Sequence, residues 1–454
     1  MTERAGLRSV MQSVALGIIC MASIQCGSDD DDGGGNAGAG GSQSQGGEGG
    51  GGTASGGAAG GEPGAAAGSG GQGGAGELAH HLYVGCRDAE GSIQHYRISS
   101  DSGAVTLGET AHANATTSNF ATNADETFVY IAHADEGRIT TFSRDRDTGE
   151  LTLADFVTVP GNAEGDADAQ TPYNVDCVDA ANPDAPTNPA TQTLTLTPDE
   201  KFLIASNWCA NTVLVYEINS DGTVGDLIQT VIDGAKSHHA VFDSTGKFVL
   251  VPYFGSSFIA SYEFDKETGM LSPVDPLTTA VPEPAGSSGP RHLAFHPREA
   301  SWLYSINETG GSISFFHFDD TDGTLAHQET VSSLPEDSPF TVEEANRSGS
   351  EIEIDAGGHF LYVSNRVDSM ANGSIGVFAI ADDGKLTPVE WEDTGGKTPR
   401  HFSLSPDGKL LVVTNQGSDN MSVFSVDQDT GELDLVDTTE VCEVPFFARM
   451  IAPL

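Results

Sequence analysis

From His80 onward the chain alternates short apolar runs with turns rich in Gly, Asp and Asn, and no long stretch shows a helical period. One repeating unit is easy to follow near the C-terminus. After a first strand comes the turn Ser405–Lys409, the apolar run Leu410–Asn415 and the alternating run Met421–Val426. A second turn and a further run that begins at Leu433 complete the unit. The pattern therefore predicts a repeat of four β-strands.

The same order of strands and turns recurs along the chain, in Asn119–Val157, Thr193–Leu227, His239–Val274, His292–Thr330, Ser350–Val389 and His401–Asp437. About 45–55 residues with four strands is typical of a β-propeller blade. The first segment, His81–Gly108, has only three of the strands, and Phe446–Ile451 can supply the missing inner one. Pairing the two chain ends would complete a seventh blade and close the ring. We therefore predict an all-β, seven-bladed β-propeller over residues 78–454.

The turn between the third and fourth strands is rich in Asp, as in Asp145–Gly149, Asp265–Gly269 and Asp427–Gly431. Carboxylates at such spacing could suggest calcium, but the later ligands of an EF-hand loop do not follow. Asp and Gly are also the residues that tight turns favour. We interpret these segments as turns, and we expect no metal and no cofactor.

Residues 1–26 are typical of an export signal, with Arg4 and Arg8 before the mostly apolar run Val10–Ile24. The run is too short and too interrupted for a membrane-spanning helix. Cys26 directly follows, which predicts lipid attachment there and a bacterial periplasmic or cell-surface location. Cys20 is a weaker alternative, and ordinary signal cleavage or an uncleaved anchor are the others. Residues 27–77 are rich in Gly, Ala and Ser, which predicts a flexible linker.

The net charge excludes some partners. The chain has 20 Lys and Arg against 66 Asp and Glu, a formal charge of −46. Nucleic acid and anionic lipid both need a basic surface. We therefore expect contact with a membrane only through the N-terminal lipid. We also expect a monomer.

Polar residues recur at two places in the repeat. His238, Arg291, His292, Arg400 and His401 lie where inner strands begin, while Glu308, Arg366 and Gln416 lie where second strands end. Second strands return antiparallel to the inner strands, so both sets are expected on one face, around the mouth of the central channel. A convergent set of this kind predicts a pocket for a small anionic ligand.

Outside the signal segment the chain has four cysteines, and no CxxC pair. An exported protein with an even number of cysteines can form disulfides. The repeat places Cys177 and Cys209 on the face of the polar residues, and it places Cys86 near Cys442. We predict the disulfides Cys177–Cys209 and Cys86–Cys442.

Several motifs together resemble the seven-bladed propeller lactonase family, which includes bacterial 6-phosphogluconolactonases and fungal carboxy-muconate cyclases. They are Gly289–Pro297, Asn307-Glu308, Phe360–Arg366, Pro399–Phe402 and Thr414–Gln416. The resemblance covers about residues 80–454. It implies that His238, Arg291, Glu308 and Arg366 fall where the cyclase branch has its proposed active site.

The chain departs from the family pattern at two places. The family often has His-x-His-Ser where this chain has Ser237-His238-His239-Ala240, so either histidine could take the catalytic position. An acidic segment of the family is replaced by Tyr253–Ser257. This replacement removes two acidic residues from that blade's part of the pocket.

The resemblance implies a metal-independent lactonase that acts on a small carboxylated or phosphorylated lactone of the sugar type, as a 6-phosphogluconolactonase does. Opening a lactone needs an activated water, an oxyanion site and a proton for the alkoxide. We expect His238 or His239 to activate water, Arg291 and Arg366 to bind the oxyanion, and Glu308 to transfer the proton. Substrate binding would involve His292, Arg400, His401 and Gln416. Alternatives are cyclase-like ring closure, and a non-catalytic surface propeller that binds a sugar acid or a protein.

Overall fold

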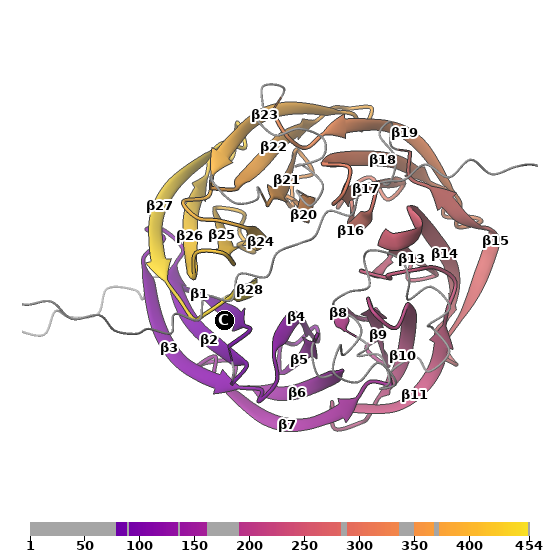
Figure 1. Ribbon diagram of the computed structural model, residues 1–454, viewed down its shortest axis with the longest axis horizontal. Helices are drawn as coiled ribbons and strands as arrows, with labels where there is room; N and C mark the ends of the chain where they lie inside the picture. Colours follow the sequence, from indigo (N-terminus) through magenta and orange to yellow (C-terminus); the bar gives the residue numbers. More distant parts are fainter. Residues whose placement is uncertain are drawn as a thin grey trace, which may run out of the picture. The chain divides into compact units, whose positions relative to one another are not determined.

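The computed structural model describes residues 79–88, 90–134, 137–160, 190–282, 288–335, 349–366 and 372–452. These residues form seven four-stranded sheets. Figure 1 shows the sheets as the blades of a ring, with the fourth strand of each blade outermost. The predicted all-β, seven-bladed propeller is confirmed. The predicted signal segment, linker, lipidation site Cys26 and Cys177 lie outside the described residues.

Blade one joins the two ends of the described chain, in the order β28 (Pro445–Ile451), β1 (Ala79–Cys86), β2 (Ser92–Ser99) and β3 (Val105–His112). Blade two comprises β4 (Thr117–Thr122), β5 (Phe128–His133), β6 (Arg138–Arg144) and β7 (Leu151–Thr158). Blade three comprises β8 (Thr191–Leu196), β9 (Phe202–Asn207), β10 (Thr212–Ile218) and β11 (Val224–Val231). Blade four comprises β12 (Val241–Phe242), β13 (Phe248–Tyr253), β14 (Phe258–Asp265) and β15 (Met270–Ala280).

The last three blades follow the same order. Blade five comprises β16 (Pro290–Phe295), β17 (Trp302–Asn307), β18 (Ser312–Phe318) and β19 (Leu325–Ser332). Blade six comprises β20 (Gly349–Ile354), β21 (Phe360–Asn365), β22 (Ser374–Ile380) and β23 (Leu386–Asp393). Blade seven comprises β24 (Pro399–Leu404), β25 (Leu410–Asn415), β26 (Asn420–Val426) and β27 (Leu433–Glu440). All neighbouring strands pair antiparallel, for example β16 with β17.

Ring closure depends on both pairing and a covalent bond. Strand β28 pairs antiparallel with β1, from His81 opposite Ile451 to Cys86 opposite Pro445. Cys86 and Cys442 form a disulfide with their Cα atoms 6.0 Å apart, across 356 residues of sequence. Two sequence predictions are therefore confirmed, the shared blade and this disulfide. A bond that closes so long a loop restricts the unfolded chain strongly.

The apolar core is divided into clusters between neighbouring blades rather than gathered at one centre. One cluster joins Tyr130 and Ile139 of blade two to Leu203 and Leu214 of blade three. This follows from the alternation of the strands, because side chains on the two faces of a blade contact the blades on either side. The arrangement leaves the centre of the ring to the polar ends of the inner strands.

The Asp-rich segments are turns, as interpreted from the sequence. Asp427 Oδ1 accepts hydrogen bonds from the amides of Asp429 and Thr430, each at 2.9 Å. Gly431 ends this turn with a φ of 78°, and a Cβ there would lie 2.5 Å from the Phe360 ring of blade six. The Gly431 carbonyl also accepts from the hydroxyl of Tyr362, again from blade six. The turn sequence thus serves the contact between neighbouring blades.

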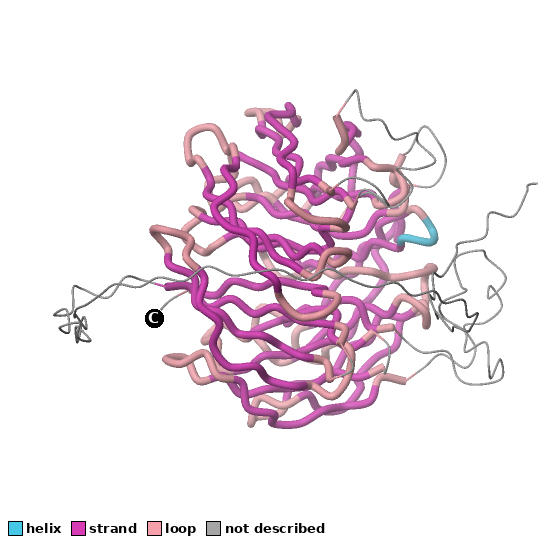
Figure 2. Tube along the Cα trace, turned by 60° about the vertical axis from the view of Figure 1, so that its left-hand side comes forward, coloured by secondary structure: helices cyan, strands magenta, loops and turns pink. Residues whose placement is uncertain are grey.

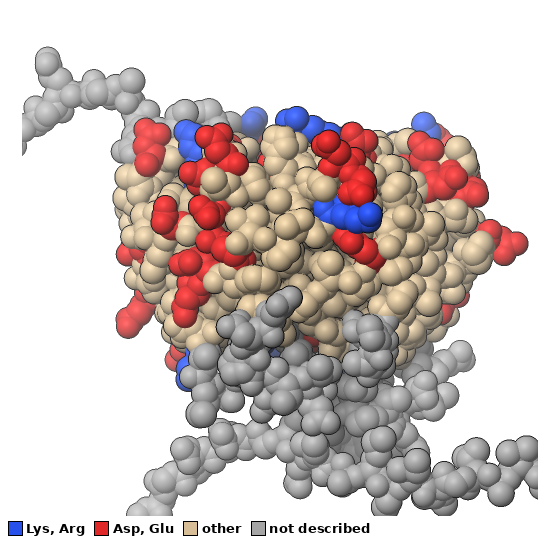
Figure 3. Space-filling model, turned by 90° about the horizontal axis from the view of Figure 1, so that it is seen from above, with Lys and Arg blue, Asp and Glu red and all other residues tan. Residues whose placement is uncertain are grey.

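Helical structure is confined, among the described residues, to the short 3-10 turn Phe254–Ser256 (Figure 2). None of the described helical structure is long and apolar enough to span a membrane. Figure 3 shows Asp and Glu in clusters over the visible surface of the ring, with Lys and Arg in smaller number. The visible surface therefore reflects the acidic composition of the chain.

Candidate functional site at the mouth of the channel

A β-bulge repeats near the start of the inner strands. In five blades the pairing with the second strand skips a single residue, and these residues are Ser118, Gln192, Arg291, Arg400 and Phe446. In blade six the bulge falls at Ser350–Glu351, and in blade four His238 lies in the equivalent segment after the Ser237–Tyr253 bridge. A bulge reorients side chains relative to regular strand alternation. It lets consecutive residues such as Arg291 and His292 both contribute to the centre of the ring.

A carboxylate and two guanidinium groups form the centre of the site. Glu308 follows β17, and its Oε1 lies 2.8 Å from Nη2 of Arg366, the residue that follows β21. Its Oε2 lies 3.5 Å from Nε of Arg291. Burial favours a higher pKa for Glu308, but Arg366 and Arg291 outweigh it and hold the pKa below its ordinary value. Glu308 is therefore a carboxylate shared by two arginines.

His238 joins this cluster through Arg291. Its Nε2 lies 2.7 Å from Arg291 Nη1, and a guanidinium can only donate. Nε2 is therefore the acceptor, and a neutral ring has its proton on Nδ1. Burial, and then the charge of Arg291, lower the pKa of His238 well below its ordinary value. His238 is thus a neutral imidazole whose basic nitrogen is occupied by Arg291.

Arg400 approaches the cluster from blade seven. Its Cζ lies 3.6 Å from the centre of the Phe446 ring, and its Nη2 is 3.5 Å from Gln192 Oε1 in blade three. Burial, followed by repulsion from Arg291 and Arg366, lowers the pKa of Arg400 well below its ordinary value. We call His238, Arg291, Glu308, Arg366 and Arg400 the arginine layer.

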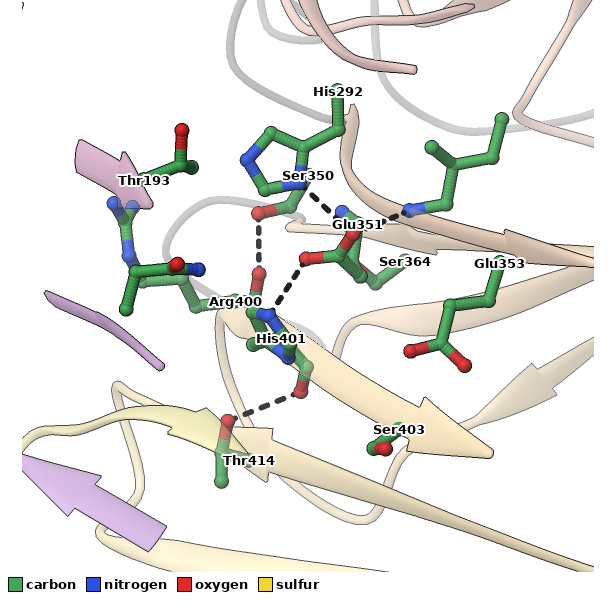
Figure 4. A network of polar contacts seen from close by, with 12 residues as sticks. Thr193, His292, Ser350, Glu351, Glu353, Ser364, Arg400, His401, Ser403 and Thr414 are labelled. Carbon is green, nitrogen blue, oxygen red and sulfur yellow. Dashed lines mark hydrogen bonds and ion pairs between the residues drawn. The ribbon is translucent and has the colours of Figure 1, made fainter. Parts of the chain in front are cut away.

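The residues one position further along form a second layer, the histidine layer, which consists of His239, His292, Glu351 and His401. Glu351 Oε1 accepts from His292 Nδ1 at 2.9 Å, and its Oε2 lies 3.0 Å from His401 Nε2. Figure 4 shows both imidazoles directed at this carboxylate from neighbouring strands. The layer therefore ties blades five, six and seven together.

The charge state of the histidine layer follows from burial. Burial lowers the pKa of His292 to about 4 and that of His239 to about 3. Glu351 is buried, which works to raise its pKa, but His292 and His401 lower it well below its ordinary value. The His239 ring accepts a hydrogen bond from the Leu293 amide through Nδ1, at 3.2 Å. The Glu351 carboxylate is thus held between two imidazoles, while His292 Nε2 and His401 Nδ1 have no hydrogen-bond partner among the described residues.

A cavity of about 310 Å³ lies along the channel beside the histidine layer. His239, His292, Glu351 and His401 contribute to its lining, together with Glu353 and Arg449. Burial raises the pKa of Glu353 to about 7, although Arg449 opposes this. Among the described residues, no group of His, Cys, Asp and Glu has an arrangement that could hold a metal ion.

The sequence predictions for the site divide into three groups. The structure brings His238, Arg291, Glu308, Arg366 and Arg400 together. It places His239, His292 and His401 in the histidine layer instead. The Gln416 backbone amide donates a hydrogen bond to the Thr398 carbonyl at 3.0 Å, and within the described part of the chain its side chain makes no hydrogen bond or ion pair with the arginine layer.

Sequence reasoning missed Glu351. A signal was present, because Ser350-Glu351 occupies in blade six the place of Arg291-His292 and Arg400-His401 in blades five and seven. The asparagines of the recurring motifs are structural by contrast. Asn307 Nδ2 donates to Ser312 and Ser314 within its own blade. Cys209 is disulfide-bonded, but Cys177 lies outside the described residues, so their pairing stays a prediction.

The chain is similar in sequence to known lactonases. Residues 72–163 and 180–449 match the family model described as "Lactonase, 7-bladed beta-propeller". The 6-phosphogluconolactonase of Yersinia pestis is 26% identical over 341 residues, which cover 71% of this chain and 97% of that protein. The 6-phosphogluconolactonase of Yersinia enterocolitica is 26% identical over 342 residues, or 72% and 98% of the two chains.

A solved structure agrees with the fold. The periplasmic gluconolactonase of Pseudomonas aeruginosa superimposes with a TM-score of 0.69 at 24% identity, over 83% of this chain and all of that one (100%). At this identity the likeness supports the fold alone. The family match extends over most of the chain and includes every residue of the arginine layer. The chain therefore belongs to the seven-bladed β-propeller lactonase family.

Proposed function

We propose that this protein hydrolyses a small lactone that carries a carboxylate or a phosphate, and that the arginine layer is its active site. The proposal depends on one observation: two guanidinium groups, of Arg291 and Arg366, share the carboxylate of Glu308, and a third, of Arg400, lies in the same layer without a carboxylate contact among the described residues. Guanidinium groups keep their proton in proteins. The free site therefore has an excess of positive charge that an anionic ligand would neutralise.

Unused donors support the same conclusion. Among the described residues, the buried atoms His238 Nδ1 and Arg366 Nε have no hydrogen-bond partner. Leaving a buried donor unpaired is costly, so these atoms favour a ligand that accepts hydrogen bonds. A carboxylate, a phosphate or a lactone carbonyl has such acceptors. The donors come from different blades, which would fix the ligand in orientation as well as in place.

Hydrolysis begins with activation of a water molecule. In the free site Arg291 occupies Nε2 of His238. When a substrate oxygen takes the hydrogen bond from Arg291, the Nε2 lone pair becomes available to a water. The imidazole accepts a proton as the water oxygen bonds to the lactone carbonyl carbon. Arg291 and Arg366 then stabilise the oxyanion, and the imidazolium returns the proton to the ring oxygen as its bond to carbon breaks.

Glu308 has a different part in this scheme from the one expected from the sequence. As a carboxylate held below its ordinary pKa, it has no proton to give to the leaving alkoxide. Its contacts instead hold the guanidinium groups of Arg291 and Arg366 at a fixed separation. We therefore assign proton transfer to His238 rather than to His239, whose ring lies in the histidine layer.

A panel of lactones tests the proposal. Purified protein would be offered carboxylated, phosphorylated and neutral lactones, with acid release followed in a pH-stat. We expect kcat/KM to be about 100-fold higher for an anionic lactone than for its neutral counterpart. Arg366→Gln should lose most of this advantage, while Arg449→Gln, at an exposed arginine beside the cavity, should keep it. Folded protein that opens none of the lactones would overturn the proposal and favour a binding role.

We also propose that the protein is exported to the periplasm or cell surface and anchored by lipid on Cys26. The Cys86–Cys442 disulfide supports an oxidising compartment. The structurally similar gluconolactonase of Pseudomonas aeruginosa is described as periplasmic. Cell fractionation is a direct test, in which Cys26→Ser should move the protein from the membrane to the soluble fraction. An unchanged distribution would contradict the lipid anchor.

A further inference from the structure

The residues that directly follow the second strands differ in chemical type around the propeller, and two of them, Glu308 and Arg366, belong to the arginine layer. In order from blade one to blade seven they are Arg87, Ala134, Trp208, Phe254, Glu308, Arg366 and Gln416. Blades five to seven and blade one present charged or polar side chains. Blades three and four present two aromatic rings. The site thus has a cationic side and an apolar side.

The two aromatic rings form one surface that reaches His238. The ring centres of Trp208 and Phe254 are 4.5 Å apart, and Trp208 meets the imidazole of His238 edge to face at 5.3 Å. Phe254 is buried, whereas Trp208 keeps part of its surface exposed. The ammonium of Lys236 lies 4.6 Å from the centre of the Trp208 ring. His238 therefore contacts Arg291 and the aromatic surface at once.

Backbone contacts hold this aromatic surface in place. The Trp208 amide donates to the Ala190 carbonyl at 3.0 Å, and the next residue, Cys209, is disulfide-bonded. The Phe254 amide donates to the Lys236 carbonyl at 3.0 Å. Gly289, in the motif that also contains Arg291, has a φ of 57°, and a Cβ there would approach the Phe254 ring to 2.9 Å. Backbone hydrogen bonds thus position this surface, and Phe254 packs against the motif that also contains Arg291.

We propose that Trp208 and Phe254 form an apolar subsite, which deepens the proposed function and rests on it. The substrate would be a lactone with its anionic group on the arginines and an alkyl, alkenyl or aryl substituent on the opposite side. A fully hydroxylated sugar lactone fits less well, because its hydroxyl groups would face two aromatic rings where the Trp208 indole N–H and the Lys236 ammonium are the donors at hand. Apolar area, in contrast, is stabilised by contact with these rings.

The test compares two carboxylated lactones of equal size and charge, one with a phenyl or propyl substituent and one with a vicinal diol. We expect kcat/KM to be at least about tenfold higher for the apolar lactone, since small apolar groups discriminate by about 10–200-fold. Trp208→Ser should bring the ratio close to one, chiefly by weakening turnover of the apolar lactone. Trp208→Leu keeps an apolar side chain and should retain most of the preference.

Phe156→Ser is the matched control, because Phe156 is an exposed aromatic residue on the outermost strand of blade two. It should leave the ratio unchanged. Equal turnover of the two lactones by the unaltered protein would overturn the subsite, and so would a ratio that Trp208→Ser leaves unchanged in folded protein.

A binding measurement can test the subsite even if the protein hydrolyses no lactone. If no lactone is opened, binding is measured by calorimetry with phenylpropanoate and with a polyhydroxylated carboxylate of similar size. Binding of the phenyl compound that is at least about tenfold tighter, and that Trp208→Ser abolishes, would support the subsite without hydrolysis. Equal affinity for the two carboxylates would overturn it.

Discussion

The arginine layer and the histidine layer are built from consecutive residues of the same strands, yet they differ in what they need from a ligand. Arg291 and His292 are neighbours on β16, and Arg400 and His401 are neighbours on β24. Burial can remove the charge of an imidazole, because its pKa lies near neutrality. It cannot remove that of a guanidinium. The histidine layer therefore centres on one carboxylate, Glu351, which two imidazoles contact, while the arginine layer has more guanidinium groups than carboxylates.

This difference assigns a supporting role to the histidine layer and a ligand-binding role to the arginine layer. In the histidine layer the contacts are internal, with Glu351 shared between His292 and His401. In the arginine layer Glu308 is shared between Arg291 and Arg366, and Arg400 contacts no carboxylate among the described residues. A layer with more guanidinium groups than carboxylates is suited to bind an anion, and a layer whose carboxylate joins three blades is suited to hold the adjoining arginines in position.

The largest effect is expected from Arg291→Lys. Lysine keeps the charge but loses the planar fork through which Arg291 contacts both His238 and Glu308. We expect kcat/KM on an anionic lactone to fall by about 100-fold or more, as for loss of one oxyanion donor. Steady-state kinetics with a continuous acid-release assay would measure it.

Arg298→Lys is the control for this substitution, because Arg298 belongs to the same blade but is exposed. It should leave kcat/KM unchanged. Turnover of Arg291→Lys equal to that of the unaltered protein would remove the main distinction between the two layers, because the fork would then be dispensable.

A smaller effect is expected from Glu351→Gln in the histidine layer. The amide is uncharged, and it can accept from only one of the two imidazoles with its single oxygen. The other ring loses its partner, and Arg291 and Arg400 on the adjoining residues lose part of their support. We expect kcat/KM to fall by about tenfold. We also expect the free energy of unfolding to fall by about 1–3 kcal/mol, the cost of an unpaired buried group, and the melting temperature to fall with it. Kinetics and thermal unfolding of the same preparation would measure both.

Glu353→Gln is the matched control for the kinetic measurement, since Glu353 lies two residues further along β20 and outside both layers. An unchanged kcat/KM for Glu351→Gln would show that the histidine layer supports the fold but not the site.

Much of this organisation could be predicted from the sequence, because a repeat multiplies weak signals. A single polar residue at a strand end predicts little, but Arg291 and Arg400 at the same position in different blades predict a shared location. The chain ends left one blade incomplete, which predicted both the β28–β1 pairing and the Cys86–Cys442 disulfide.

The division into two layers could not be predicted, because it depends on a bulge. Regular strand alternation would direct Arg291 and His292 to opposite faces of the blade, and only the skipped pairing lets both serve the channel. The choice between His238 and His239 depended on the same detail. Glu351 was missed because it differs in type from the histidines that occupy its position in blades five and seven.

The smallest effect is expected from Glu353→Gln, and it concerns stability rather than activity. Glu353 Oε2 accepts from the Leu404 amide at 2.9 Å, and burial raises its pKa from an ordinary 4.5 to about 7. A raised pKa means that the folded protein holds this proton more tightly than the unfolded chain does. The contribution to stability is therefore complete below pH 4.5 and is lost as the pH rises through about 7.

Glutamine cannot ionise, so the variant should escape this loss. We expect its melting temperature, relative to that of the unaltered protein, to increase between pH 5 and pH 8 by an amount that corresponds to about 1–3 kcal/mol. Thermal unfolding across this range would measure the difference, with kcat/KM unchanged within about twofold because Glu353 lies outside both layers. Parallel stability curves would show that the Glu353 carboxylate is solvated in the cavity. In that case burial would shift pKa values in the two layers but not that of Glu353 in the cavity.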